Sequence, residues 1–472
     1  MSLFFCTVLL LLSCSVFGQD VLPEGMKESG TVEEQEMDTL EERGVDTVEE
    51  HDLVTIKEKE VLTVEKAVKM ALENNYQIKT ASNELKIDSI SVSPGNAGMF
   101  PSLAAQITDN NSIQNLSQTR SDGTKVERNN AKNNSLNYGV ALDWTLFDGL
   151  RMFANLEQLK QTQKLGEAEL KQVILTKVGE VMITYYDLVQ QQQQLSALDS
   201  TLLISKQRVE LAHNRFTIGK ASKLEVLNAQ VDLNTDRTLM RRQQELYVNT
   251  KIQLNEHLAR DLKLDFKVIP EIFVDEKLKL PELETQIANE NPQLQAQLIN
   301  KKIRELEVKQ IKAGRYPTIF ATTGYNFGRS ESDLGFSTSA NSRGFNYGFG
   351  ATLNLFDGFT QNRNEQIGKI AVKNAEVAIA EQKQELMSLV GTTYQTYLTN
   401  ISLIVLEGNN EAIAKENLDI TVEKYRIGTI PTIEFRTAQL NYINAKVRHS
   451  NAKFQAKLSE IILKQLSGRL DL

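Results

Sequence analysis

The chain encodes the same strand-to-helix corner twice, half its length apart. The letters LFDG occur at 146–149 and again at 355–358, an offset of 209 residues. Two flanking segments keep this offset: NYGVALDWTLFDG (137–149) parallels NYGFGATLNLFDG (346–358), and RFTIGKASKLEVLNAQ (215–230) parallels KYRIGTIPTIEFRTAQ (424–439). Self-similarity at a fixed offset is the mark of a repeated structural unit. The sequence therefore predicts two copies of one unit, residues 61–269 and 281–468, joined by a linker at 270–280.

Each copy contains a segment in which nothing prevents a very long helix. Proline is absent from 102–269 and from 318–430, and an interior proline would break a helix. A helix from Gly149 to Phe216 would be roughly 100 Å long. Apolar residues recur every seven positions, which predicts coiled-coil packing. They are Val181, Leu188, Leu195, Leu202, Val209 and Phe216 in the first copy, and Val390, Tyr397, Ile404, Leu418 and Tyr425 in the second, where Glu411 is the exception.

The segments before each LFDG alternate with period two, which predicts strands. We expect strands at about 100–112, 135–147, 317–329 and 344–356, following a helix at the start of each copy. Large apolar residues form one face and small polar residues the other, as in Leu136, Tyr138, Val140, Leu142, Trp144 and Leu146 opposite Asn137, Gly139, Ala141, Asp143 and Thr145. This pattern and length suit strands that contact lipid around a watery interior. A half-buried sheet in a soluble protein is the alternative.

The segment between Pro101 and Asn137 is expected to contain a loop. Upstream, AGMFPSL (97–103) parallels AGRYPTI (313–319) with an offset of 216, so seven residues of length difference fall in this segment. It is rich in Asn, Ser, Gln and Gly. Insertions and deletions concentrate in exposed loops.

The N-terminus has the composition of an export signal followed by an acidic arm. Residues 1–18 form an apolar run of signal-peptide length. Cleavage after Gly18 and lipidation of Cys14 are both compatible with the sequence. Residues 20–60 carry fifteen acidic and four basic side chains, so we expect residues 19–60 to be disordered. Cys6 and Cys14 are the only cysteines, so no disulfide or thiolate metal site is expected after export.

The repeated corner has a structural explanation. Asp148 and Asp357 stand where a strand ends and a helix begins, and an aspartate there can accept a hydrogen bond from a free backbone N–H. The following Gly149 and Gly358 allow a sharp turn. A ring of pore carboxylates at this level is the functional alternative.

Four strands are too few to close a membrane barrel. The smallest barrels have about eight strands, and an open edge in lipid leaves backbone groups unpaired. If the strands span a membrane, several copies of the chain must share one barrel.

Taken together, the motifs resemble those of the TolC-type outer-membrane efflux proteins. The resemblance covers Val61 to Leu466 and rests on LTVEKAVKMALENNYQI (62–78), both LFDG corners, RFTIGKASKLEVLNAQ and KYRIGTIPTIEFRTAQL. It implies an α+β membrane protein, a homotrimer with a twelve-stranded β-barrel in the outer membrane. Each chain would supply four strands and part of a long α-helical coiled-coil barrel in the periplasm. A periplasmic adaptor protein and an inner-membrane pump are the implied partners, and small molecules would pass outward unchanged.

The resemblance also implies that the two IG turns form the periplasmic tip, which docks the adaptor and closes the tunnel. The residues carried over are Phe216, Ile218, Gly219, Ala221, Ser222 and Leu224 in the first copy, and Tyr425, Ile427, Gly428, Ile430, Pro431 and Ile433 in the second. From the residues alone, each glycine can reverse a helix, and Pro431 suits the first turn of the returning helix.

Gate residues are expected at the same tip. Glu225 and Glu434 occupy matching positions and could form carboxylate rings, which favour cations; solvated glutamates at a helix start are the alternative. Some family members close the tip with an arginine partnered by a tyrosine and aspartates. Here Tyr425 matches the tyrosine, but Ile430 replaces the arginine and Thr437 an aspartate. An apolar constriction near Ile430 is the replacement hypothesis.

No chemistry is expected from this chain. His51, His213, His257 and His449 lack metal-ligand spacing, and no phosphate loop or nucleophile motif is present. We therefore expect no cofactor, no catalysis and no nucleic-acid partner, and interpret the QQQQQ tract (190–194) as a solvated helix face. The expected function is an outer-membrane efflux duct. The alternatives are the outer-membrane component of a type I protein-secretion system or a secreted coiled-coil structural or adhesive protein.

Overall fold

The computed structural model describes residues 61–333 and 337–470. The expected signal peptide (1–18), with its choice between Gly18 and Cys14, and the expected acidic arm (19–60) lie outside the described residues. Everything below concerns the described part.

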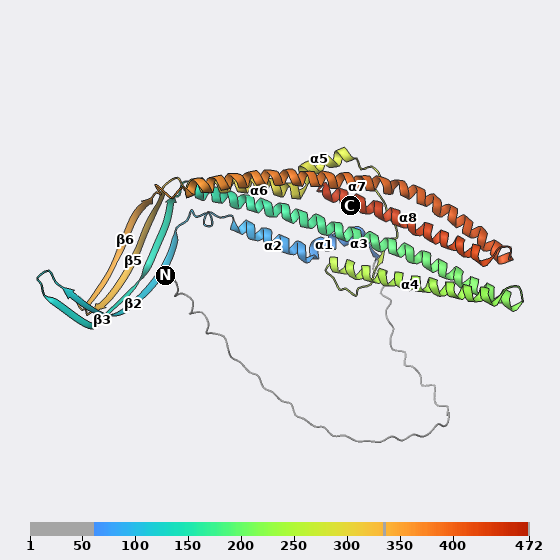
Figure 1. Cartoon of the computed structure of the whole chain (residues 1–472), viewed down its shortest axis with the longest axis horizontal. Helices are drawn as coiled ribbons and strands as arrows, with labels where there is room; N and C mark the ends of the chain where they lie inside the picture. Colours follow the sequence, from blue (N-terminus) through green and yellow to red (C-terminus); the bar gives the residue numbers. More distant parts are fainter. Residues whose placement is uncertain (1–60, 334–336, 471–472) are drawn as a thin grey trace, which may run out of the picture. The chain divides into compact units, whose positions relative to one another are not determined.

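The described chain runs twice through the same order of elements (Figure 1), which confirms the duplication. Each copy has a short strand, two short helices, two long strands, a very long helix and a returning helix. The first copy consists of β1 (Val61–Leu62), α1 (Val64–Asn74), α2 (Tyr76–Ser91), β2 (Ser102–Thr119), β3 (Lys125–Phe147), α3 (Arg151–Thr217) and α4 (Lys223–His257). The second consists of β4 (Lys267–Val268), α5 (Leu280–Glu290), α6 (Pro292–Ala313), β5 (Thr318–Ser332), β6 (Ser339–Thr352), α7 (Thr360–Ile427) and α8 (Thr432–Leu466).

The four long strands form one antiparallel sheet in the order β2-β3-β5-β6. Its central pair joins the two copies, since β3 ends the first pair of strands and β5 begins the second. β2 and β6 are the two edges, and neither has a second neighbour within the described chain. The sheet is therefore open on both sides.

The first hairpin is longer than the sequence indicated. β2 and β3 extend through most of the segment expected to be a loop and turn only at residues 120–124, where Gly123 adopts φ 82°. The backbone ladder continues from Ser112 opposite Asn133 to Thr119 opposite Lys125, with one irregularity near Leu116. Backbone hydrogen bonds hold such a ladder without apolar side chains. The outer part of this hairpin therefore forms strands although its sequence lacks the alternation of apolar and polar residues from which the other strands were predicted. β6, by contrast, ends at Thr352, four residues earlier than expected.

One face of the sheet is apolar and uncovered. The register aligns Ile107 with Tyr138 and Tyr138 with Phe327, and the last two rings stack with centroids 5.0 Å apart. On the edge strand β6, Tyr347 and Phe349 are 77 % and 79 % exposed. The opposite face carries small and amide residues, and Asn326 donates to Asn346 across it at 2.8 Å. A large exposed aromatic face is the surface expected of a lipid-contacting sheet.

The long helices pack side by side. α3 packs against α4 and α8, and α7 packs against α8, so α4 and α7 stand at the two edges of this row. On α7 the buried side chains follow the seven-residue period, as Val390, Tyr397, Leu418 and Tyr425 show. On α3 the period is apolar at Val181 and Leu188, but nearer the turn the buried residues are Thr201, Ser205, Arg208 and Ala212.

A belt of short elements crosses one face of the long helices. β1 pairs in parallel with β4, and Leu62, Val68 and Phe266 pack on the middle of α3. The linker after β4 then contacts three helices in turn: Gln193 of α3 donates to the Pro270 carbonyl, Glu460 of α8 accepts from the Asp275 N–H, and Tyr394 of α7 donates to the Leu278 carbonyl. The linker is therefore a strap that ties the two copies together.

Both LFDG corners use two successive left-handed residues. Gly149 and Leu150 have φ 74° and 69°, and Gly358 and Phe359 have φ 66° and 63°. Asp148 Oδ2 accepts from the Met152 N–H at 2.9 Å, and Asp357 Oδ2 accepts from the Gln361 N–H at 2.7 Å. Each aspartate therefore satisfies a backbone donor in the first turn of a long helix.

The two corner glycines provide a matched pair for mutation. A Cβ on Gly149 would lie 2.4 Å from the Ala313 carbonyl oxygen, whereas a Cβ on Gly358 would meet nothing within 4 Å. We expect Gly358→Ala to cost about 1 kcal/mol, because alanine disfavours positive φ. Gly149→Ala should cost about 1–3 kcal/mol more, because the backbone must also shift. Thermal melts of the detergent-purified variants by circular dichroism measure this, and equal melting temperatures would contradict it.

Candidate functional site: the helical tips

Each long helix ends in the same kind of turn. The Lys220 N–H donates to the Arg215 carbonyl at 2.7 Å, and the Thr429 N–H donates to the Lys424 carbonyl at 3.0 Å. Gly219 and Gly428 have φ 76° and 83°. This bonding pattern around a left-handed glycine is a Schellman motif, which ends a helix and reverses the chain. The two IG segments are therefore the tips of two helical hairpins, α3–α4 and α7–α8 (Figure 1).

The two returning helices begin differently. Ser222 precedes α4, and its hydroxyl accepts from the Glu225 N–H at 3.3 Å. Pro431 precedes α8 and stands at the N-cap, one residue earlier than the sequence suggested, with no side-chain cap. Serine is a good N-cap because its oxygen satisfies a free backbone donor. The turn of the second hairpin has no such bond.

The apolar residues carried over to the tip are mostly exposed. Ile218, Leu224, Ile427 and Ile433 are among the exposed large apolar residues, and Phe216 is 41 % exposed. Ala221 and Ile430 are half-buried, and Ser222 and Pro431 are exposed. A cluster of exposed apolar side chains at a helical turn is typical of a surface that binds another protein.

Tyr425 and Glu225 meet across the two copies. Tyr425 donates to Glu225 Oε1 at 3.1 Å, and the Thr432 hydroxyl donates to the same oxygen at 2.8 Å. The Arg215 guanidinium lies 3.6 Å from Glu225 Oε1 and 5.6 Å from the centre of the Tyr425 ring. One carboxylate therefore links α3, α4, α7 and α8. We call Arg215, Glu225, Tyr425 and Thr432 the tip cluster.

Burial keeps the Tyr425 phenol of the tip cluster protonated. Tyr425 is 2 % exposed, and its ring packs against Phe435 with centroids 5.0 Å apart. Burial raises the pKa of the Tyr425 phenol, and the nearby negative charge of Glu225 acts in the same direction, while the hydrogen bond that the Thr432 hydroxyl donates to the phenol oxygen opposes them. The phenol therefore stays protonated, and remains a donor, at physiological pH.

The two matching glutamates have different surroundings. Glu225 is held by three partners, whereas the Glu434 side chain is exposed and makes no ion pair or side-chain hydrogen bond with any described residue. Thr437, which replaces the aspartate of other family members, is also exposed. The same residue type at equivalent positions of the two repeats therefore makes different contacts.

A group of buried charges, which was not predicted from the sequence, lies on α3, α4 and α8 about one to three helical turns farther from the hairpin turns than the tip cluster. Arg436 of α8 donates twice to Asp236 of α4, at 2.8 and 2.9 Å, and its Nε lies 3.7 Å from Asp232. Arg208 of α3 pairs with Asp232. The signal available in the sequence was a break in the repeat, because Arg436 aligns with Leu227, Asp236 with Ala445 and Arg208 with Asn417.

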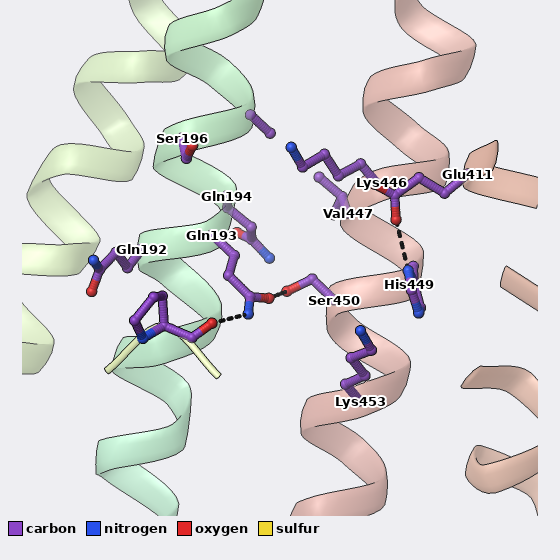
Figure 2. Close-up of a pocket in the computed structure, with 12 residues that line it drawn as sticks. Gln192, Gln193, Gln194, Ser196, Glu411, Lys446, Val447, His449, Ser450 and Lys453 are labelled. Atoms are coloured by element: carbon purple, nitrogen blue, oxygen red, sulfur yellow. Dashed lines mark hydrogen bonds and ion pairs between the residues drawn. The ribbon is translucent and has the colours of Figure 1, made fainter. Parts of the chain in front are cut away.

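The interpretation of the QQQQQ tract as a solvated face was wrong. Gln190 and Gln191 are buried. Gln190 donates to Asn451 of α8, and Gln191 donates to Thr250 of α4. In Figure 2, Gln193 lies between the strap and α8, donating to the Pro270 carbonyl and accepting from Ser450, both at 2.8 Å. Glutamines suit this place because one amide can both donate and accept between helices.

A cavity of about 440 Å³, lined mostly by polar residues, lies beside these glutamines, between α3 and α8. Figure 2 shows Lys446, His449 and Lys453 of α8 along one side of it. His449 Nδ1 lies 2.6 Å from Glu411 of α7, the residue that interrupts the apolar heptad. The pair bridges α7 and α8 where an apolar contact was expected from the period.

The described residues lack two features that other membrane transport proteins have. Within 61–333 and 337–470 no three His, Cys, Asp or Glu side chains are grouped so as to hold a metal ion. In the same residues, no helix combines the length and apolar character needed to cross a bilayer.

Comparison with known proteins identifies the family to which the chain belongs. The model of the family described as outer membrane efflux protein matches residues 67–260 and 283–469, one segment in each copy. Protein CyaE of Bordetella pertussis is 22 % identical over 414 residues, which are 86 % of this chain and 83 % of that protein.

Solved structures agree with the family match. The Campylobacter jejuni CmeC outer membrane channel has a TM-score of 0.72 and 18 % identity, over 86 % of this chain and 85 % of that one. A membrane protein from Pseudomonas aeruginosa also has a TM-score of 0.72, with 17 % identity, over 86 % of this chain and 90 % of that one. The expected resemblance is confirmed, and so is the α+β fold of duplicated strand pairs and long helical hairpins. The chain belongs to the outer membrane efflux protein family.

Proposed function

We propose that three copies of the chain form one duct through the outer membrane, with a twelve-stranded barrel in lipid and a helical tunnel in the periplasm. Small molecules pass outward through it without chemical change. A periplasmic adaptor protein binds the tips and connects the duct to an inner-membrane pump. Family membership already identifies an outer-membrane efflux protein; the copy number, the partners and the gate are the parts proposed.

The open, apolar-faced sheet is the observation that carries this proposal. Its edges, β2 and β6, lack partners within the described chain, and its exposed aromatic face suits lipid. Unpaired backbone groups in hydrocarbon cost several kcal/mol each. Pairing β6 of one copy with β2 of the next satisfies them all at once. Three copies of four strands give a closed barrel of a size known for bacterial outer membranes.

The helical row also has two uncovered edges. α7 exposes Val377, Val405 and Ile413, and α4 exposes Val231 and Leu246. Apolar rows on the two outermost helices fit a neighbouring copy on each side, because packing them removes apolar surface from water. The same rotation that joins β6 to β2 would join α7 to α4. Sheet and helices therefore support one assembly.

The tips support the proposed partner and gate. Exposed apolar residues around Gly219 and Gly428 offer a docking surface for the helical or looped end of an adaptor. The tip cluster holds the two hairpins of one chain together through Glu225. In this proposal the gate is the bond between Glu225 and Tyr425, in place of the apolar constriction expected near Ile430. Ile430 is a half-buried residue of the turn.

Deleting the gene should sensitise cells to small toxic molecules while leaving the export of large proteins intact. The physical reason is that an efflux duct carries what its pump supplies, and loss of the exit stops the whole path. Minimum inhibitory concentrations and the profile of secreted proteins measure the two outcomes. Loss of one secreted protein with unchanged drug sensitivity would favour the protein-secretion alternative and contradict the proposal.

Glu225→Gln should increase the conductance of the purified channel in planar bilayers. The substitution removes the ion pair with Arg215 and weakens the bonds from Tyr425 and Thr432, each worth about 1–3 kcal/mol to a charged acceptor. Glu434→Gln is the matched control, because its carboxylate holds nothing in the described chain. It should leave conductance unchanged and only reduce preference for cations. Equal conductance changes in both variants would contradict a gate at Glu225.

A further inference from the structure

We propose that Arg329 and Arg343 bind the phosphate of a lipid in the outer leaflet, while the aromatic rings beside them hold its acyl chains. The inference rests on the proposed function, because it needs the sheet to lie in the membrane with the long helices in the periplasm. It adds a ligand class, a lipid with an anionic phosphate headgroup, and names the two residues of each chain that recognise it.

On β5 the lipid-contacting face of the sheet ends at a sharp level. This face carries Ile319, Tyr325 and Phe327, and from Ile319 to Phe327 it extends about 26 Å along the strand. That length is close to the height of the apolar band of an outer-membrane barrel, which is about 25 Å. The next residues of the same face, toward the turn, are Arg329 and Glu331. The face therefore changes from aromatic to charged side chains in a single step of the alternation.

β6 changes in the same way beside it. Phe349, Tyr347 and Phe345 follow one another on the same face of the strand, and all three are exposed. The rings of Phe345 and Tyr347 have their centroids 5.9 Å apart. The next residue of this face, toward the turn, is Arg343, which is exposed and whose side chain makes no hydrogen bond or ion pair with any described residue. A row of lipid-contacting rings therefore ends in an unpaired cation.

The register of β5 and β6 makes the two arginines neighbours. Arg343 is opposite Phe327, and Arg329 is opposite Asn341. The arginines are therefore diagonal neighbours on adjacent strands, and such neighbours lie about 7 Å apart. Two long side chains at this separation can reach one phosphate group between them. Arginine suits this task because its planar guanidinium matches two phosphate oxygens at once.

The direction of the chain puts this pair at the outer end of the sheet. β3 and β6 lead through Asp148 and Asp357 into the long helices, so that end of the sheet faces the periplasm in the proposed duct. Arg329 and Arg343 lie toward the opposite end, next to the turn between β5 and β6. Where a protein surface leaves the hydrocarbon, the anions within reach are the headgroups of lipids.

Glu331 reduces the positive charge of the pair without cancelling it. Arg329 donates to Glu331 Oε1 through Nη2 at 2.7 Å, which leaves its other N–H groups for a second acceptor. Two arginines and one glutamate carry a net charge of +1. This charge favours a headgroup with a net negative charge over a zwitterionic one.

The experiment is a lipid titration of the purified and delipidated oligomer, followed by native mass spectrometry. The probes are dipalmitoyl phosphatidic acid, dipalmitoyl phosphatidylcholine and inorganic phosphate. The wild type should bind the phosphatidic acid more tightly than the phosphatidylcholine, and inorganic phosphate in excess should not displace it, because the acyl chains on the aromatic face add to the affinity. Arg329→Gln and Arg343→Gln should each raise the Kd for the phosphatidic acid about fivefold, because each removes a charged donor at an exposed site. Arg237→Gln is the matched control, since Arg237 is an exposed arginine of α4.

Three results would overturn the lipid site. The first is an equal Kd for both lipids in the wild type, and the second is a Kd in both sheet variants equal to that of Arg237→Gln. The third is displacement of the phosphatidic acid by inorganic phosphate, which would assign the arginines to a free anion.

A contact between copies is the competing role for Arg343. In the proposed barrel β6 adjoins β2 of the neighbouring copy, where Asp109 lies on the lipid-contacting face opposite Leu136 of β3. If Arg343 pairs with that carboxylate, Arg343→Gln and Asp109→Asn will both lower the melting temperature of the oligomer and leave the Kd for the phosphatidic acid unchanged, which would also overturn the lipid site. A wild-type oligomer that conducts but does not prefer the phosphatidic acid would refute the lipid site alone. A wild-type protein that forms no oligomer would refute the proposed function.

Discussion

The structure depends on one constraint: backbone hydrogen-bonding groups in a lipid environment must find partners within the protein. The aromatic face of this sheet is stable against lipid, but the backbone N–H and C=O groups at its two free edges have no hydrogen-bond partners there. Residues 61–333 and 337–470 supply no further long strand, because both strand pairs of the repeat are already in the sheet. Completion by other copies then follows from the sheet itself, and the uncovered edges of the helical row are consistent with it. Because the chain is duplicated, each of its two repeats supplies half of the strands and long helices of that chain. The contacts between the repeats can then differ from one another.

The two repeats differ mainly at polar positions. α7 keeps the seven-residue apolar period in the second repeat. By contrast, Glu225 and Glu434 are equivalent in position but have different surroundings, and so do Arg436 and Leu227. The tip cluster and the ion pair between Arg436 and Asp236 both lie within the chain, between its own two hairpins.

Sequence reasoning was strongest where a pattern is long and repeated. The helix expected from Gly149 to Phe216 is α3, from Arg151 to Thr217, because a missing proline and a sustained heptad leave little alternative. It was weaker for the polar hairpin, since Asn and Ser strands such as Ser112–Thr119 are held by backbone bonds that leave no mark in the side-chain pattern. The QQQQQ tract was misread for a related reason. Its burial depends on α4, α8 and the strap, all distant in sequence.

The candidate site divides in the same way. Gly219 and Gly428 could be found locally, because the left-handed residue that ends a helix is usually glycine. The partner of Glu225 is 200 residues away in Tyr425, and Asp236 is 200 residues from Arg436, so no local pattern could pair them. Only the mismatch between aligned copies pointed to Arg436. Comparing equivalent positions of a repeat is therefore a direct way to locate residues that have acquired a role of their own.

Native mass spectrometry of the membrane-extracted protein in detergent tests the central claim most directly. The account predicts a mass of three chains after the detergent has been stripped in the instrument, and the mass of a single chain once the sample has been heated. A monomer that is stable in water without detergent would show that the sheet edges and the aromatic face are satisfied within one chain, and would contradict the account.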